Sequence, residues 1–411
     1  MRLHPKSWKS SPNTVETDWA SHPENAMARF TYYLADQVPV EHGDTIWRKP
    51  LPDNRNGHPR NPSPGGIPAP TYGDYFEAAT TFLDNPRGNP IMAAADQLLE
   101  RPSETQPVAR VEIHLVKHGA FYHPARVKTA LGSQSLSLAL NLAFADIGIK
   151  NLDGEFNNLQ YLAGALPLSY LPRVFAKSAL QTRQGIPCKL FLAEWLDGYH
   201  EFHLSRSSRG RAPRVVVWNG QRGGAALSQG QVGSLLAQAA TILTCYFNPF
   251  TFNQIYPWHH AAGDFVVRLA GDVPQVRLIT VRGYQPLFET HGELPPSELA
   301  LNALLVFALN TTLRMRLDRI DGVGDLVMHE TPMVASIWQG IQAGVQQLVS
   351  VHGLPEQFIR LWRDYVRTCT RDDIAELYEL LLQRYRDRGD EAVLMGEHLA
   401  EHIIAFHEAC R

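Results

Sequence analysis

Residues 256–268, YPWHHAAGDFVVR, place the adjacent His259 and His260 and the acidic Asp264 around three small residues. An imidazole exchanges protons near neutral pH, and histidine and aspartate side chains together can hold a divalent cation. The small residues let the backbone approach a ligand closely. We therefore expect a functional loop, with His259 and Asp264 catalytic and Asp264 and His260 as metal ligands. The alternative is a rigid turn whose polar side chains satisfy nearby backbone groups.

Four other segments carry polar groups of interest. Glu155 opens the helical pattern GEFNNLQYLAGAL, where an acid suits either an ion pair or the helix dipole. Residues 117–127, KHGAFYHPARV, resemble a phosphate-binding turn but lack several glycines, so a plain hairpin turn is the alternative. His200 and His203 point to opposite faces of a strand, which argues against a shared metal ion. Residues 314–325, RMRLDRIDGVGD, predict a solvated helix end.

Composition limits the class of protein that contains this loop. The chain has 411 residues, of which 44% are hydrophobic and 19% charged, so it can bury a large core in two or three lobes. With 38 basic and 41 acidic residues it lacks a wide basic field, and we expect no nucleic-acid partner. The four cysteines form no CxxC pair, and no apolar run is long enough to span a bilayer. A cytoplasmic protein without membrane association is predicted.

The elements that must position the loop follow from local patterns. Residues 1 to about 72 carry eleven of the 28 prolines and predict an extended arm. One or two short helices are expected between residues 73 and 100. From residue 108, the segments VARVEIHLVKHG, ARVKTAL and SLSLALNLAF predict three antiparallel strands with turns near Gly119 and Gly132.

Beyond these strands the pattern alternates between helices and strands. The helix that carries Glu155 precedes an apolar strand ending in FLAEWLDG. A Ser-x-x-Gln signature at Ser228 predicts the start of a long helix. The histidine loop then leads into a hairpin with its turn at LAGDVPQ, and the chain is mostly helical from about residue 296.

This order of elements resembles the protein-kinase-like fold of protein kinases and aminoglycoside phosphotransferases over residues 108–330. The resemblance implies an α+β, bilobal chain with a small antiparallel N-terminal sheet and a larger helical C-lobe. The expected boundaries are a Pro-rich arm with short helices at 1–107, a β-rich N-lobe with one helix at 108–193, and the hinge and helical C-lobe at 194–411.

The resemblance also implies roles for individual residues, with ATP and Mg²⁺ as cofactors. Glu194 and Trp195 correspond to the hinge whose backbone reads the adenine edge. Glu155 corresponds to the acid that pairs with a phosphate-contacting lysine, and Asp264 to the metal-binding residue that follows the catalytic aspartate by five positions. Glu155 and Asp264 are therefore expected to face each other across a cleft.

Three positions depart from the family pattern. His259 stands where the catalytic aspartate belongs, Thr280 where a second metal-binding aspartate belongs, and Asn141 where the lysine belongs. Lys117 and Lys128 are the candidate replacements for that lysine. Phosphoryl transfer depends mainly on positioning and on neutralising phosphate charge, so these losses remove large electrostatic contributions.

Three functions therefore remain open. The first is a divergent nucleotide-dependent phosphotransferase acting on a small-molecule or protein acceptor. The second is a catalytically silent kinase-like binding or regulatory module, that is, a pseudokinase. The third is a hydrolase or other transferase with a His/Asp metal site. The patterns predict neither the acceptor nor the oligomeric state.

Overall fold

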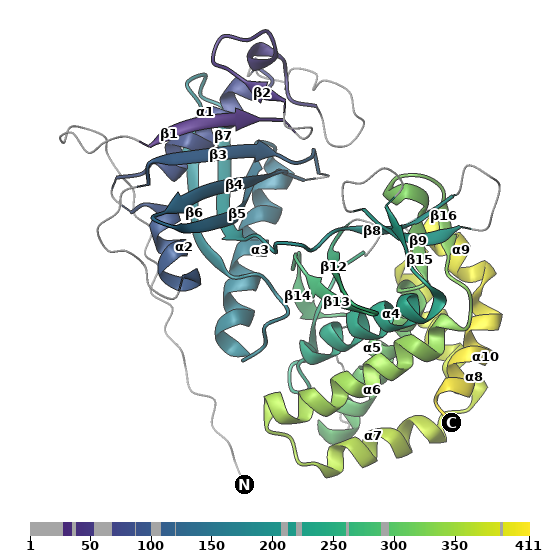
Figure 1. Cartoon of the computed structure of the whole chain (residues 1–411). Coiled ribbons are helices and arrows are strands. Elements are labelled where there is room, and N and C mark those ends of the chain that lie inside the picture. The colour runs from purple at the N-terminus through teal and green to yellow at the C-terminus, as the bar shows by residue number, and fades with distance from the viewer. Residues whose placement is uncertain are drawn as a thin grey trace.

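The computed structural model describes residues 28–34, 38–52, 68–86, 88–99, 108–119, 121–206, 213–218, 224–259, 263–288, 296–386 and 389–411. These residues form a mixed α+β fold whose largest sheet has seven strands in the order β2-β1-β3-β4-β5-β7-β6 (Figure 1). Its strands are β1 Arg29–Tyr33, β2 Pro39–Val40, β3 Arg110–Leu115, β4 His123–Leu131, β5 Gln134–Ala143, β6 Val174–Gln181 and β7 Pro187–Glu194.

The centre of this sheet confirms the three predicted antiparallel strands. β3, β4 and β5 alternate buried and more exposed residues, as a strand does when one face packs against the core. Val127 on β4 lies opposite Ile113 on β3 and Leu138 on β5. Gly132, with φ of 61°, makes the turn between β4 and β5.

The expectation of an irregular arm over residues 1 to about 72 is wrong for residues 29–33. This segment forms β1 and pairs in parallel with β3. Its sequence, RFTYY, is aromatic and β-branched and contains no proline, so the prolines around it concealed a strand. Pro39 lies in β2 at the edge of the sheet, where a missing N–H is tolerated. The N-terminal 27 residues and residues 53–67 lie outside the described part of the chain.

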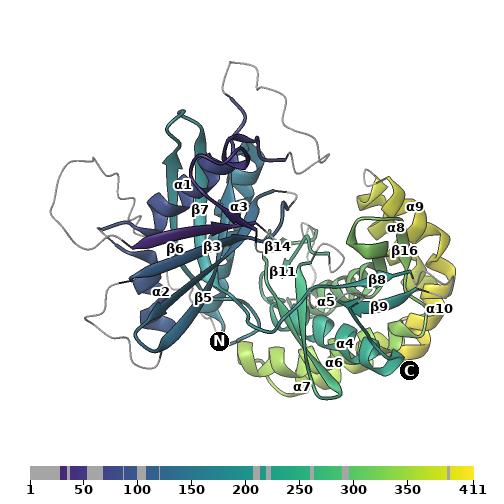
Figure 2. The ribbon, with the colours of Figure 1, turned by 45° about the horizontal axis from the view of Figure 1, so that its top comes forward.

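Helices cover both faces of the sheet. α1 Tyr72–Leu83 and α2 Pro90–Leu98 pack on one face, in a hydrophobic cluster that includes Leu190 and Leu192 of β7. α3 Asp146–Ala165 packs on the other face against Phe191 and Ala193 (Figure 2). The alternation of β7 residues between the two clusters explains why this strand is apolar from Leu190 to Ala193. α1 begins with a capping box between Thr71 and Asp74.

α3 begins earlier than predicted. It starts at Asp146, so Glu155 lies in the middle of the helix and not in its first turn. The helix-dipole explanation for Glu155 is therefore wrong. The helix continues through Gly148 and Gly154. At Gly148 a Cβ would lie 2.1 Å from the carbonyl oxygen of Phe121, so glycine is required by this close approach.

The chain leaves the sheet at Glu194 and forms the helical part of the molecule. Its strands are β8 Phe202–Ser205, β9 Arg214–Val217, β10 Ala225–Ala226, β11 Asn253–Ile255, β12 Phe265–Ala270, β13 Val273–Leu278, β14 Tyr284–Pro286, β15 Leu317–Arg319 and β16 Leu326–Met328. Its helices are α4 Gln229–Cys245, α5 Pro296–Arg314, α6 Met333–His352, α7 Gln357–Thr368, α8 Arg371–Arg384, α9 Asp390–Glu397 and α10 Leu399–Ala409.

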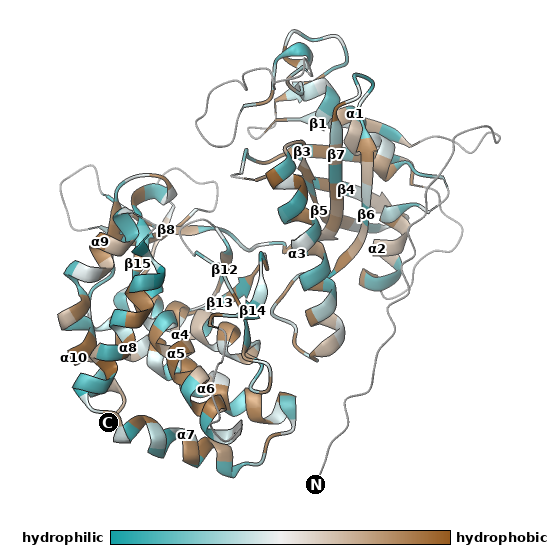
Figure 3. Cartoon of the chain, turned by 180° about the vertical axis from the view of Figure 1, so that it is seen from behind, coloured by the Kyte–Doolittle hydropathy of each residue, from teal (hydrophilic) through white to brown (hydrophobic). Residues whose placement is uncertain are grey.

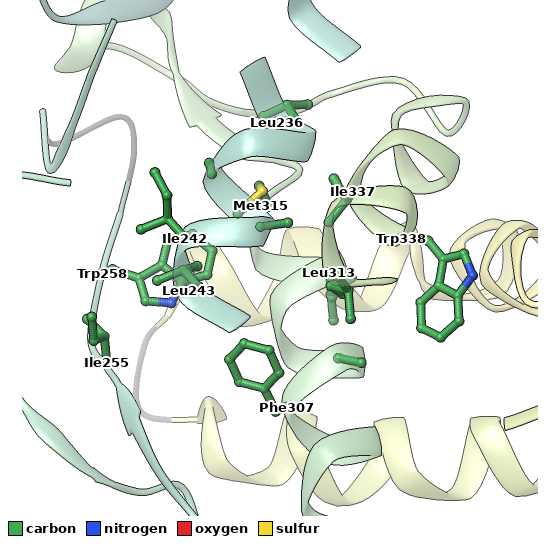
Figure 4. Packing of buried hydrophobic residues seen from close by; sticks show 14 of the residues in the cluster. Leu236, Ile242, Leu243, Ile255, Trp258, Phe307, Leu313, Met315, Ile337 and Trp338 are labelled. Atoms are coloured by element: carbon green, nitrogen blue, oxygen red, sulfur yellow. The ribbon is translucent and has the colours of Figure 1, made fainter. Parts of the chain in front are cut away.

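α4, α5 and α6 form the centre of this part. Leu243 of α4, Phe307 of α5 and Ile337 of α6 are each 1% exposed or less and belong to one hydrophobic cluster (Figure 4). Ser228 caps α4 through the predicted capping box with Gln231. The predicted hairpin is confirmed as β12 and β13, which pair antiparallel and pack beside α4. Among the described residues, no helix combines the length and apolar character needed to cross a membrane.

Residues 314–325 do not form a solvated helix end. α5 ends at Arg314, and the chain continues into β15 and the short helix Ile320–Gly322. Arg314, Arg316 and Asp318 are at most 2% exposed. Each charge has a partner that permits burial: Arg314 pairs with Glu391, Arg316 with Glu401, and Asp318 accepts from the backbone N–H of Leu204.

The C-terminal helices, which alternate hydrophilic and hydrophobic residues in Figure 3, enclose a buried histidine. Arg316 Nη1 lies 3.2 Å from Nδ1 of His402, and Tyr378 Oη lies 2.7 Å from its Nε2. Because arginine only donates, Nδ1 accepts and the imidazole is neutral. Burial, followed by the charge of Arg316, lowers the pKa of His402 to about 3.

This lowered pKa predicts acid sensitivity. An unfolded histidine titrates near pH 6.5, so the stabilisation is present above that pH and is lost as pH falls toward 3. We expect the free energy of unfolding to fall by about 2 kcal/mol between pH 6.5 and 5 because of His402. Denaturant titrations at both pH values should show a smaller fall in His402→Gln. The control is His42→Gln, whose side chain is 73% exposed. An unchanged fall in His402→Gln would contradict the assignment.

Candidate functional site

Glu155, on α3, is buried at the side of the sheet that faces the helical part of the chain. It is 1% exposed, and the hydroxyl of Tyr122 donates a hydrogen bond of 2.7 Å to Oε2. Burial raises the pKa of Glu155, although the hydroxyls of Thr280 and Tyr122 and the charge of Arg282 act in the opposite direction. Burial and the charge of Glu155 also raise the pKa of Tyr122 well above its usual value, so the phenol remains a donor.

Asp264 directly precedes β12 and is 1% exposed. Both of its carboxylate oxygens accept hydrogen bonds from Arg282, each at 2.5 Å. Oδ2 also accepts from the backbone N–H of His259 at 2.8 Å. The paired geometry is that of a bidentate arginine–carboxylate interaction, which fixes both side chains. Asp264 therefore links the backbone of His259 to Arg282, in the segment that follows β13.

Arg282 connects the two acids. Its guanidinium lies 6.0 Å from the ring centroid of Phe121, beside Tyr122. Burial opposes the charged guanidinium, but Asp264, Tyr122 and Glu155 together raise the pKa of Arg282. The charge of Asp264 in turn contributes to the raised pKa of Glu155. We call Tyr122, Glu155, Asp264 and Arg282 the Arg282 network. It contains the two acids that were expected to face each other across a cleft, but both are only 1% exposed, so they do not line an open cleft.

Lys117 pairs with an acid outside this network. The ammonium group contacts Oε1 of Glu201, a residue that immediately precedes β8. Oε2 of Glu201 lies 3.7 Å from Nε2 of His203. Although burial raises the pKa of Glu201, His203 and Lys117 lower it overall. Gly263 has a φ of 73°, which favours glycine, and a Cβ there would lie 2.7 Å from this carboxylate and displace it.

His259 faces the C-terminal helices. Its Nε2 lies 3.9 Å from Oε1 of Glu391 on α9, and Arg314 lies next to the same carboxylate. Burial, followed by the charge of Arg314, lowers the pKa of His259, which favours a neutral imidazole at pH 7. The predicted metal ligand His260 lies outside the described residues. Within the described ranges, no group of three His, Cys, Asp or Glu residues is placed to hold a metal ion.

Glu194 and Trp195 lie where the chain leaves the sheet. The backbone N–H of Glu194 donates to the carbonyl of Arg173 at 2.8 Å, and its carboxylate lies 3.5 Å from Nε of the same arginine. Arg126 lies over the Trp195 ring at 5.2 Å and pairs with Asp197. The linker is thus held to the sheet by two arginines.

Sequence patterns missed three members of the site: Tyr122, Glu201 and Arg282. Arg282 follows the mostly buried residues 278–281, LITV, which continue from the end of β13, and a charge at the end of a buried run is a signal for a buried ion pair. Tyr122 carried no such signal, because an aromatic residue in a hairpin turn is common. The positive charge of Arg282 thus acts on both Glu155 and Asp264. Both carboxylate oxygens of Asp264 already accept hydrogen bonds, from Arg282 and from the backbone N–H of His259.

Comparison with known proteins identifies no family. No family model matches the chain, and no curated protein matches it. Among solved structures, one titled "WaaP in complex with acyl carrier protein" is similar at a TM-score of 0.23 and 10% sequence identity, and the match covers 59% of this chain and 84% of that chain. A likeness at this score carries no argument about fold or activity.

Proposed function

We propose that the chain is a kinase-like binding or regulatory module that does not transfer phosphate. The kinase-like layout rests on the order of elements: an antiparallel sheet, the helix with Glu155, a linker at Glu194 and Trp195, then α4, the histidine loop and the β12–β13 hairpin. Function must be argued from the site, because folds of this kind host several activities.

The observation that carries the proposal is the bidentate contact of Arg282 with Asp264. A carboxylate that binds Mg²⁺ must offer its oxygens to the ion, whereas those of Asp264 are already engaged by a fixed cation. Glu155 likewise accepts from Tyr122 and lies beside Arg282, so its counter-charge is not a lysine. Lys117 pairs with Glu201 in place of a phosphate.

Each of these contacts replaces an interaction that phosphoryl transfer requires. Thr280 stands where a second metal-binding aspartate is needed, and His259 stands where the acceptor hydroxyl would meet a carboxylate. The rival function, a divergent phosphotransferase using ATP and Mg²⁺, requires Arg282 to leave Asp264 when the nucleotide arrives. That step would break the ion pair of the buried Asp264 carboxylate, which costs free energy.

Turnover of ATP separates the two functions. Purified chain is incubated with γ-labelled ATP and Mg²⁺, and released phosphate and labelled protein are measured over hours. We expect both to remain at the level of a buffer blank. Mg²⁺-dependent release that disappears in a folded His259→Ala variant, but persists in the surface variant Arg206→Met, would overturn the proposal in favour of a phosphotransferase.

A further inference from the structure

A second candidate site lies on the sheet-bearing part of the chain. A pocket of about 300 Å³ is bounded by β1, the short helix Ile46–Arg48, α1 and the turn between β6 and β7. This volume is at the lower end of the range for small-molecule sites. No residue of the Arg282 network lines it.

Aromatic rings form one wall of this pocket. The Tyr32 and Trp47 ring centroids are 5.4 Å apart, and those of His42 and Trp47 are 5.1 Å apart. Trp47 is fixed from behind, because Phe76 stacks on it at 5.9 Å and a Cβ on Gly73 would lie 2.3 Å from its indole nitrogen. The aromatic wall therefore forms without a ligand.

A carboxylate lies beside the rings. Oε2 of Glu77 is 3.2 Å from Nε of Arg183, and Oε1 is 3.8 Å from Nε2 of His42. The Arg183 side chain is 83% exposed, whereas that of Glu77 is 27% exposed. An ion pair with so exposed a partner is weak, so another cation can displace Arg183 from Glu77. Arg183 thus marks where a positive charge is accommodated.

Several hydroxyls of the pocket already form hydrogen bonds within the chain. The hydroxyls of Tyr32 and Thr80 bond to each other at 3.0 Å, and that of Thr81 donates to the Glu77 carbonyl. A primary ammonium donates three hydrogen bonds and is best held by several converging acceptors, whereas Glu77 is the one carboxylate among the described residues that line this pocket. A methylated ammonium needs none; it requires aromatic faces and one counter-charge, and tryptophan is the most favourable of those faces.

We propose that this pocket binds a small organic cation with a quaternary, methylated ammonium group. The cation lies against Trp47 and Tyr32, Glu77 supplies the counter-charge, and Arg183 swings into solvent. The site is independent of the proposed function, since it shares no residue with the Arg282 network.

Calorimetric titration with choline tests the proposal, with its uncharged isostere 3,3-dimethylbutan-1-ol as the matched ligand. We expect saturable choline binding that is at least about ten-fold tighter than binding of the alcohol, because only the cation gains from the ring faces and Glu77. Glu77→Gln should weaken choline binding by about ten-fold. Arg183→Ala should strengthen it, because the competing cation is removed. Glu376→Gln, an exposed acid on α8, is the control and should change nothing.

Three outcomes would overturn the proposal. Equal binding of choline and the alcohol would indicate an apolar pocket only. Weaker choline binding in Arg183→Ala would show that Arg183 builds the site and does not compete for it. Absence of saturation in the wild type and in Arg183→Ala alike would show that the pocket does not bind such a cation. Because Arg183 is exposed, its variant keeps the test valid even if Glu77→Gln unfolds.

Discussion

Replacing Arg282 by methionine is expected to lower the free energy of unfolding by about 3 to 5 kcal/mol, because it leaves the Asp264 carboxylate buried without its counter-charge. Asp264 is 1% exposed and receives both of its side-chain contacts of 2.5 Å from Arg282. Methionine has nearly the volume of the arginine stem, so the loss reports charge more than packing. Denaturant unfolding at pH 7 measures it.

Two further variants make this result specific. Arg206→Met removes an exposed arginine that pairs with Asp325, and a change of at most about 1 kcal/mol is expected. The double variant Arg282→Met with Asp264→Asn also removes the Asp264 charge and should be more stable than Arg282→Met alone, because the Asp264 carboxylate no longer remains buried without its bidentate partner. A loss below about 1 kcal/mol in Arg282→Met would show that water or another cation reaches Asp264 readily.

Gly340→Ala is expected to cost about 3 kcal/mol, because it forces α4 and α6 apart. An ideal Cβ on Gly340 would lie 2.0 Å from the carbonyl oxygen of Ala237, which is backbone and cannot rotate away. Gly344 makes a similar approach to Thr244 along the same pair of helices. The thermal midpoint and the denaturant midpoint should both fall.

Gly164→Ala is the matched control for Gly340→Ala. Gly164 also lies within a helix, α3, but a Cβ there meets no atom within 4 Å. Alanine should therefore stabilise the chain by about 0.5 to 1 kcal/mol, through the lower entropy of the unfolded state. If both variants lose stability equally, the close contact between α4 and α6 is not what requires glycine.

Local patterns predicted much of the fold, since most of its elements carry their own signals. The alternation in β3, β4 and β5 and the capping signature at Ser228 each depend on a few neighbouring residues, and each was confirmed. β1 was missed because its partner β3 lies about eighty residues away, so nothing local specifies the parallel pairing.

The site was less predictable, because its residues meet only in three dimensions. Glu155 and Asp264 were selected as a pair, and the network joins them. Their partners were not foreseen: Arg282 takes the counter-charge, and Tyr122 reaches Glu155 from a hairpin turn. A buried charge requires some partner, but only the fold determines which residue supplies it.

Calorimetric titration of Mg·ATP into the wild-type chain tests the central claim most directly, because the claim is that Arg282 occupies the Asp264 oxygens that a nucleotide-bound metal ion would need. We predict no saturable heat that depends on Mg²⁺ at nucleotide concentrations up to about 5 mM, well above typical substrate affinities. Saturable binding that requires Mg²⁺ would contradict the account, since Asp264 would then have exchanged Arg282 for a metal ion.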